Sequence, residues 1–276
     1  MKTWLLTFVT LTLVHAQQGP RIFIVTDLEG VGGVNNWDEQ VTPGQRRFEE
    51  SRRLLIDEVN AAVEGALEGG AGEVVIWDGH DGSRTLSIDA IPPRARLIQG
   101  RPTPADYYLS DGHYDGIIFI GQHAKAGTPD GLLAHSQSLS VRDITINGKS
   151  VGELGQVAAI AGYFGIPVIM LAGDQAACRE FLEIQPKGET VAVKRMIGKA
   201  SALSLSHAEA CAAIRAAARR AVQRIKEFSP WIIQGPVEMR FEFHPKKTET
   251  GELQPVPPRI YRGQTVLEAF QQWLGK

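Results

Sequence analysis

Five side chains that can bind metal ions follow predicted strand ends or begin a predicted helix. They are Asp27, Glu29, His80, His123 and Glu153. In a parallel α/β sheet the carboxyl ends of the strands open onto one crevice, where residues far apart in the sequence can meet. Three carboxylates and two imidazoles suit two zinc ions or a similar metal. A carboxylate of the Asp27 turn could bridge the two ions, so the spacing predicts a two-metal site.

A sixth side chain, His135, lies in a polar segment, residues 124–142, that we interpret as an ordered active-site loop. Its imidazole could transfer protons near neutral pH. Lys125 could stabilise an oxyanion or be a solvated loop lysine, and the sequence favours neither. Each residue alone has a simpler explanation, such as a helix cap, a surface histidine or an acid favoured by a helix dipole. Only the combination predicts chemistry.

Apolar runs and turn signals predict the elements that position these side chains. Short apolar runs bounded by glycine or proline predict buried strands at residues 22–25, 73–78, 115–121 and 167–171, with weaker strands at 95–99 and 190–196. Periodic segments predict helices that begin at Thr42-Pro43, Gly152, Gly173-Asp174, Ser206 and Thr265. The fold class is therefore α/β, with a mostly parallel sheet and helices on both faces.

The C-terminal part of the chain has a different pattern. Asn147-Gly148 predicts a two-residue hairpin, and the strict alternation of residues 237–243 predicts a half-exposed antiparallel strand. We expect a metal-binding α/β catalytic core over residues 17–189, and a smaller α+β subdomain, residues 190–276, packed on it.

The first 16 residues have the features of a signal peptide. Lys2 precedes an apolar stretch from Trp4 to Val14, and a small-residue cleavage pattern ends at Ala16. The stretch is shorter than the roughly 20 residues that span a bilayer, so we expect no stable membrane insertion. We expect an exported protein, periplasmic or secreted; a short N-terminal anchor is the alternative.

The composition argues against a nucleic-acid-binding protein and against a disulfide-rich one. The chain has 29 basic and 31 acidic residues and no basic stripe with interleaved aromatics, so we expect no nucleic-acid partner. Its two cysteines, Cys178 and Cys211, fall in predicted helices, which favours free thiols over a disulfide.

Six short motifs follow one another across residues 21–245. They are Val25-Thr26-Asp27-Leu28-Glu29-Gly30, Asp78-Gly79-His80, Gly-Gln-His-Ala-Lys-Ala-Gly-Thr-Pro at 121–129, Ala134-His135-Ser136, Asn-Gly-Lys-Ser-Val-Gly-Glu-Leu-Gly at 147–155, and Leu171-Ala172-Gly173-Asp174. In order and spacing the chain resembles the zinc-dependent D-aminopeptidases, the DppA-like M55 metallopeptidases. No single motif is specific, but the set is.

The resemblance implies an activity and an assembly. In such enzymes the positions matching Asp27, Glu29, His80, His123 and Glu153 bind two zinc ions, with the aspartate bridging, and the position matching His135 is the catalytic nucleophile or base. It further implies a ring-like homo-oligomer, such as a decamer, whose sites face an inner chamber. The expected substrates are short peptides with an N-terminal D-amino acid, of the D-alanine type if the protein is exported.

Two other functions remain as alternatives. In a haloacid-dehalogenase-like phosphatase, Asp27 would accept a phosphoryl group beside magnesium, but the second acid here is Glu29 and three histidines do not suit that ion. The other alternative is an exported peptide-binding protein with structural metal ions. His135 would distinguish it, because a closed structural site needs no additional base.

Overall fold

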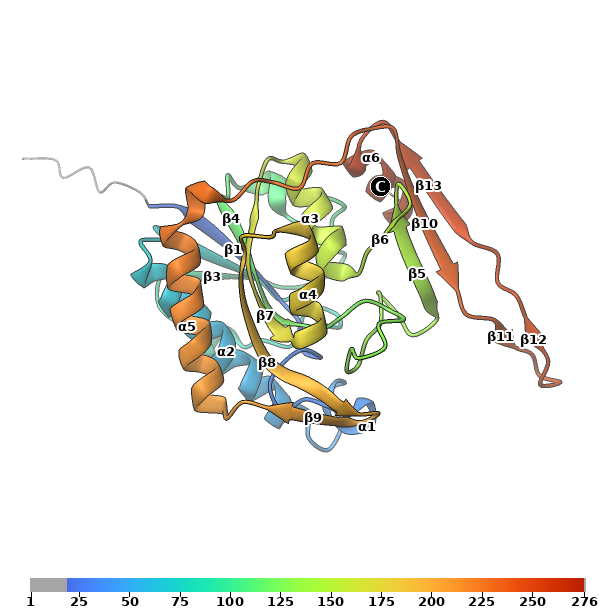
Figure 1. Cartoon of the computed structure of the whole chain (residues 1–276), viewed down its shortest axis with the longest axis horizontal. Helices are drawn as coiled ribbons and strands as arrows, with labels where there is room; N and C mark the ends of the chain where they lie inside the picture. The colour runs from blue at the N-terminus through green and yellow to red at the C-terminus, as the bar shows by residue number, and fades with distance from the viewer. Residues whose placement is uncertain (1–18, 276) are drawn as a thin grey trace, which may run out of the picture.

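A seven-stranded sheet forms the centre of the molecule (Figure 1). The computed structural model describes residues 19–275. In spatial order the strands are β3 (Ala95–Ile98), β2 (Glu73–Trp77), β1 (Arg21–Thr26), β4 (Gly116–Gln122), β7 (Val168–Asp174), β8 (Glu189–Gly198) and β9 (Ser201–Ser204). All neighbouring pairs are parallel except β8 and β9. The strand order reverses between β1 and β4, where open α/β sheets bind their ligands.

Residues 22–25 of strand β1 are all apolar, and they are buried because both faces of the sheet are covered. Ile22 and Ile24 belong to the core on one face, and Phe23 and Val25 to the core on the other. This follows from the alternation of side chains along a strand. Each such burial stabilises the fold by about 1.5–3 kcal/mol. The apolar run thus fixes the strand that leads into Asp27.

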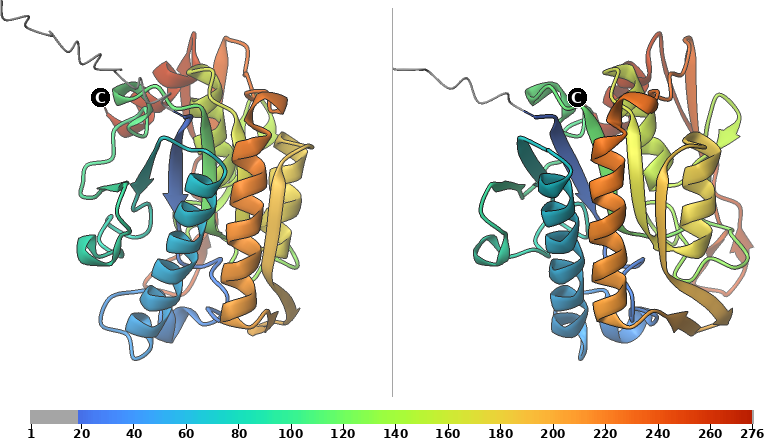
Figure 2. Two further views of the ribbon diagram at one scale, coloured as in Figure 1. Left: turned by 90° about the vertical axis from the view of Figure 1, so that its left-hand side faces the viewer. Right: turned by 60° about the vertical axis from the view of Figure 1, so that its left-hand side comes forward.

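Helices cover both faces of this sheet, which confirms the predicted fold class. On one face, α2 (Phe48–Glu68) and α5 (His207–Gln223) lie side by side (Figure 2). On the other lie α3 (Glu153–Tyr163) and α4 (Gln175–Ile184). The short α1 (Trp37–Gln40) contacts α2, and α6 (Val266–Leu274) packs on the second sheet. Single 3₁₀ turns span Ile88–Ala90, Leu109–Asp111 and Ile225–Glu227.

A second, antiparallel sheet lies beside α3 and α6. Its strands, in order, are β13 (Arg259–Gly263), β10 (Val237–Phe243), β5 (Val141–Ile146) and β6 (Lys149–Ser150). The predicted hairpin at Asn147-Gly148 is confirmed, since both residues have positive φ, 48° and 80°, and join β5 to β6. Beyond β10, the strands β11 (Lys246–Lys247) and β12 (Leu253–Gln254) form a hairpin that projects from the body (Figure 1).

The long helix begins later than predicted. It starts at Phe48, and residues 42–47 form turns instead. The Gln45 side-chain oxygen accepts hydrogen bonds from the backbone N–H groups of Val41 and Thr42, at 2.7 and 2.8 Å. Gly44 has φ +90°, a conformation that no α-helix contains. The expected start at Thr42-Pro43 was therefore wrong, because a side-chain bond competes with the helix there.

The expected change near residue 190 does not interrupt the central sheet. β8 pairs with β7, and α5 packs against α2, so residues 189–223 complete the main sheet and its helical layer. The antiparallel sheet likewise combines β5 and β6 with β10 and β13. Pairing between distant segments decides this, and the local pattern carries no information about it.

The expected signal peptide, residues 1–16, lies outside the described residues. Within residues 19–275, no helix combines the length and the apolar character that a membrane crossing requires. Cys178 is buried and Cys211 half-buried, and both are free thiols, as predicted.

The ends of β1 and β4 approach so closely that a side chain at Gly121 has no room. The N–H of Gly30 donates to the Gly121 carbonyl at 2.7 Å, and Asp27 N–H donates to that of Ile120 at 2.8 Å. A Cβ on Gly121 would lie 2.0 Å from the Asp27 carbonyl oxygen. The backbone around Asp27 is thus positioned by direct contact with β4.

We expect Gly121→Ala to lower the free energy of unfolding by about 2 kcal/mol more than Gly127→Ala. Both glycines have positive φ, +76° and +80°, but Gly127 has open space where a Cβ would lie. The control therefore measures the backbone strain alone, about 1–2 kcal/mol. Urea denaturation of both variants checks this. Equal destabilisation would contradict the close approach.

Candidate metal centre

The structure brings all six predicted site residues into one cluster at the carboxyl end of the central sheet. Asp27 directly follows β1, and His123 directly follows β4. The other members lie in the loops after β1, β2 and β4 and at the first position of α3; they are Glu29, His80, His135 and Glu153. Asp27, Glu29, His80 and His123 are buried. The switch point between β1 and β4 thus carries the whole set.

Asp27 lies at the centre of the cluster, and its two carboxylate oxygens face different imidazoles. Oδ1 is 3.1 Å from His80 Nδ1, and Oδ2 is 3.1 Å from His123 Nε2. Glu29 Oε2 is also 3.1 Å from His80 Nδ1. Glu153 Oε1 is 3.6 Å from His123 Nε2. One carboxylate therefore joins two groups of potential ligands.

Backbone carbonyls fix the tautomer of each imidazole. His80 Nε2 is 2.8 Å from the Val41 carbonyl, and His123 Nδ1 is 2.8 Å from that of Ala124. A carbonyl oxygen only accepts, so these nitrogens carry the proton of the neutral ring. The other ring nitrogens, His80 Nδ1 and His123 Nε2, then direct their lone pairs toward Asp27. This is the arrangement of metal-binding histidines, whose second nitrogen donates to a neighbouring acceptor.

His135 lies on the same side as His123. The two rings stack with centroids 3.9 Å apart and planes 14° apart. His135 Nδ1 donates to the Leu133 carbonyl at 3.0 Å, which leaves Nε2 free, 3.7 Å from Glu153 Oε1. The Trp37 ring contacts His135 edge-on, with centroids 5.1 Å apart. His135 is thus close enough either to bind a metal ion itself or to act as a base beside a bound ion.

Burial opposes the charged forms of these groups, but neighbouring charges outweigh it. Burial would raise the pKa of Asp27, yet His123 and His80 hold that pKa well below its usual range. Burial would lower the pKa of both imidazoles; Glu29 with Asp27 raises that of His80, and Asp27 with Glu153 raises that of His123, well above 6.5. The pKa of Glu153 is lowered despite burial, chiefly by His123. The cluster therefore favours a cation, a proton or a metal ion, beside each unshared nitrogen.

Two buried atoms of the cluster lack a hydrogen-bond partner. They are His123 Nε2 and Glu29 Oε2. Unpaired buried polar atoms are rare in folded proteins. In tetrahedral zinc sites, ligand atoms about 2.0–2.2 Å from the ion lie roughly 3.3–3.6 Å from one another, close to the separations found here. The donor set and its geometry therefore fit zinc.

Buried polar groups hold the loop that carries Asp27 and Glu29. The ammonium of Lys194, in β8, is buried and donates to the carbonyls of Glu29 and Val34. Burial lowers the pKa of Lys194 to about 8, against nearby carboxylates that raise it. Glu58, in α2, accepts from the Gly32 N–H at 3.0 Å. Burial raises the pKa of Glu58 to about 7, although the Gly32 N–H and Lys194 act to lower it.

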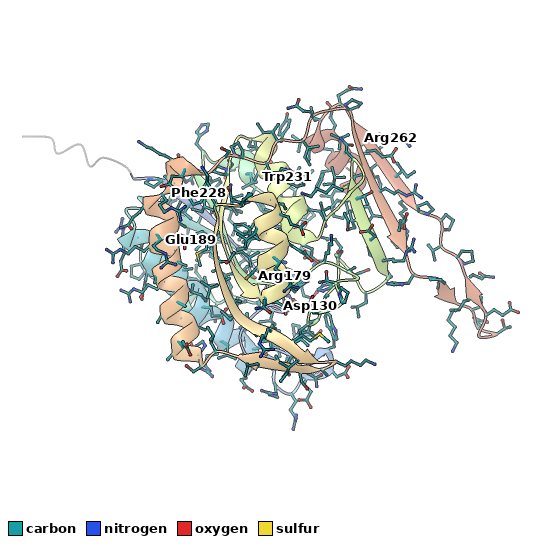
Figure 3. The ribbon with its side chains drawn as sticks, viewed as in Figure 1. Asp130, Arg179, Glu189, Phe228, Trp231 and Arg262 are labelled. Atoms are coloured by element: carbon teal, nitrogen blue, oxygen red, sulfur yellow. The ribbon has the colours of Figure 1, made fainter. Side chains whose placement is uncertain are left out.

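Helix α4 holds the loop that carries His135. Asp174 accepts from Ala176 N–H at 2.6 Å, which caps the helix, and from Leu132 N–H at 3.3 Å, which ties down the loop. Arg179 binds both oxygens of Asp130, at 2.7 and 2.5 Å, and the pair is labelled in Figure 3. The loop is therefore ordered, as the sequence predicts.

Lys125 does not face the cluster. Its backbone N–H donates to Glu180, in α4, at 3.1 Å, and its ammonium reaches the Ser150 carbonyl at 3.4 Å. It lines a separate charged hollow with Arg142 and Arg179. The structure thus favours a loop lysine over an oxyanion-stabilising one.

Two connected hollows lie over the cluster, and Asp27, Gly79, Arg101, Gln137 and Glu153 line both. The first, which we name the apolar hollow, has a volume of about 340 Å³, and its apolar walls come from Val25, Trp77, Tyr107, Val157, Trp273 and Leu274. The second, the acidic hollow, has a volume of about 490 Å³ and carries Glu29, Asp38, Asp81, His80 and His135. The cluster is therefore open to a small ligand.

The sequence analysis did not identify the residues that hold the candidate ligands in place. Gln122 donates from Nε2 to Asp27 Oδ2 at 3.2 Å, although the motif around it was noted without assigning it a role. A polar residue at the end of a buried strand is the signal that could have identified it. Lys194 had no such signal, because a lysine in a strand is ordinarily solvated.

Comparisons with known proteins identify relatives of this chain. The sequence model of peptidase family M55, described as D-aminopeptidase, matches residues 21–268. A curated relative, a D-aminopeptidase of Bacillus subtilis (strain 168), is 36% identical over 191 residues, which are 69% of this chain and 69% of that protein. Among solved structures, the Zn-dependent D-aminopeptidase DppA from Bacillus subtilis, a self-compartmentalizing protease, superimposes with a TM-score of 0.82. That match has 28% identity and covers 92% of this chain and 96% of the other.

The family match extends over nearly all the described residues, and it includes all six residues of the cluster. The fold agrees over almost the full length of both chains. This chain therefore belongs to peptidase family M55, the D-aminopeptidases.

Proposed function

We propose that this protein is an aminopeptidase that hydrolyses short peptides with an N-terminal D-amino acid, of the D-alanine type, through a two-zinc site. The observation that carries the proposal is the placement of Asp27, whose two oxygens face two imidazoles with fixed tautomers. The zinc dependence of the Bacillus subtilis structure supports the choice of metal.

In this proposal Asp27, Glu29, His80, His123 and Glu153 would hold the two ions, and the Asp27 carboxylate would be shared between them. Bound zinc supplies a Lewis acid that polarises a carbonyl and makes water more acidic. The protein residues orient the substrate. Carboxylates of the acidic hollow, among them Asp38 and Asp81, suit a free substrate amine, which favours aminopeptidase over endopeptidase action.

His135 is proposed to move the proton. Its Nδ1–H is engaged by the Leu133 carbonyl, so Nε2 can take a proton from the attacking water and give it to the leaving amine. Stacking on His123 and the edge contact with Trp37 restrict the ring to this orientation. A phosphatase or a binding protein with structural metal would have no use for this residue.

We further propose that the protein acts as a homo-oligomer. The DppA structure is described as self-compartmentalizing, which supports this. The projecting β11–β12 hairpin, which includes the exposed Leu253, offers a contact surface. Light scattering of the purified protein measures the mass, and a decamer is the expected size. A monomeric mass would contradict the proposal.

Export is the remaining proposal. It is based on the signal-peptide features of residues 1–16 alone. Cleavage after Ala16 would leave Gln17 at the N-terminus. N-terminal sequencing of protein recovered outside the cytoplasm tests the cleavage, and an intact Met1 there would favour the N-terminal anchor instead. Protein found only in the cytoplasm would contradict export.

We expect the zinc-loaded protein to hydrolyse D-alanyl dipeptides, with far slower turnover of the L-isomers. Chelation should abolish turnover and zinc should restore it, since zinc is the proposed Lewis acid of the reaction. Elemental analysis should find two zinc ions per chain, and fewer in Asp27→Asn. Two ions retained in that variant would exclude a bridging role for Asp27.

His135→Ala should retain its zinc and lower kcat by about 100-fold or more, as expected for loss of a general base. Metal content and kcat are measured on the same sample. Loss of one zinc ion together with activity would instead identify His135 as a ligand. Unchanged kcat would remove the residue from the mechanism.

A further inference from the structure

Arg101 is an arginine whose guanidinium has no hydrogen-bond or ion-pair partner among the described residues. It follows β3 in an exposed loop, and its Nε lies against Gly82, 3.8 Å from the place a Cβ would occupy there. Within residues 19–275 its guanidinium forms no hydrogen bond or ion pair. By contrast, Arg142, Arg179 and Arg262 each pair with a carboxylate. The charge of Arg101 is therefore available to a ligand.

The guanidinium belongs to the crevice over the candidate metal centre. Arg101 lines both the apolar and the acidic hollow, together with Asp27 and Glu153. Among the described residues that line these hollows, it is the only lysine or arginine. A crevice with carboxylates on one side and a single free guanidinium attracts a ligand that carries both signs of charge.

A short peptide has these two charges at its ends. Its amine suits the acidic hollow, and its carboxylate suits a guanidinium, which can bind both carboxylate oxygens in parallel. One extended residue spans only about 3.3–3.6 Å, so a carboxylate near the metal ligands belongs to a residue close to the scissile bond. The apolar hollow, at about 340 Å³, lies at the small end of ligand sites. It can take one side chain between Trp77, Tyr107 and Trp273.

We propose that Arg101 binds the C-terminal carboxylate of the substrate, which makes dipeptides with a free carboxylate the preferred substrates. This inference rests on the proposed peptidase function and names the substrate feature that the site recognises. Lengthening the peptide moves the carboxylate past Arg101, and capping it as an amide removes the charge.

The test compares D-alanyl-D-alanine with its C-terminal amide. The wild-type protein should have a kcat/KM about 10- to 100-fold higher for the free acid, the range of a hydrogen bond to a charged group. Arg101→Met should lose that preference by lowering kcat/KM for the acid alone, and Arg101→Lys should keep part of it. Arg84→Met is the matched control, because Arg84 is an exposed loop arginine that lines neither hollow.

A binding measurement separates this inference from the proposed function. Calorimetry on zinc-loaded protein with His135→Ala measures the affinity for acid and amide without requiring turnover, with and without Arg101→Met. If this discrimination depends on Arg101 while the zinc-loaded wild-type protein hydrolyses no peptide, the carboxylate site is supported and the peptidase function is contradicted. Equal affinity for acid and amide in the presence of Arg101, or equal losses for both in Arg101→Met, would overturn the inference.

Discussion

The structure depends on one electrostatic constraint at the switch point of the sheet. Backbone carbonyls fix one nitrogen of His80 and of His123, so that the other nitrogen of each faces an oxygen of Asp27 at 3.1 Å. Lone pairs and carboxylates cannot be buried together without positive charge between them. The fold thus creates a site that requires cations, and the surrounding elements maintain it.

Buried charged side chains and close backbone contacts hold the loop after β1 in place. Lys194 binds two carbonyls of the loop after β1, and Glu58 binds the same loop from α2. Each would be costly to bury alone, and a hydrogen-bonded arrangement offsets the cost only in one geometry. Gly121 lets β4 contact the backbone of Asp27 directly. The candidate ligands are therefore held by residues that line neither hollow.

Charged and aromatic side chains are unevenly distributed over the crevice above the cluster. Of the two hollows, the carboxylates of Glu29, Asp38 and Asp81 line only the acidic one, the aromatic rings of Trp77, Tyr107 and Trp273 line only the apolar one, and Arg101 lines both. Under the proposals made above, a substrate with an amine at one end and a carboxylate at the other would be aligned by these charges before any bond changes. Recognition of both ends would select for length, because both ends must reach their partners at the same time.

The sequence by itself determined the α/β class, the identity of the six cluster residues and the hairpin at Asn147-Gly148. These follow from local patterns: apolar runs, turn residues and polar side chains at strand ends. Only the tertiary structure decided that Gln122 and Lys194 support the ligands, that Lys125 faces away, and that residues 189–223 complete the central sheet. It also moved the helix start from Thr42 to Phe48 through the bonds of Gln45. Strand pairing and side-chain contacts join residues far apart in the sequence, and local propensity does not encode those partners.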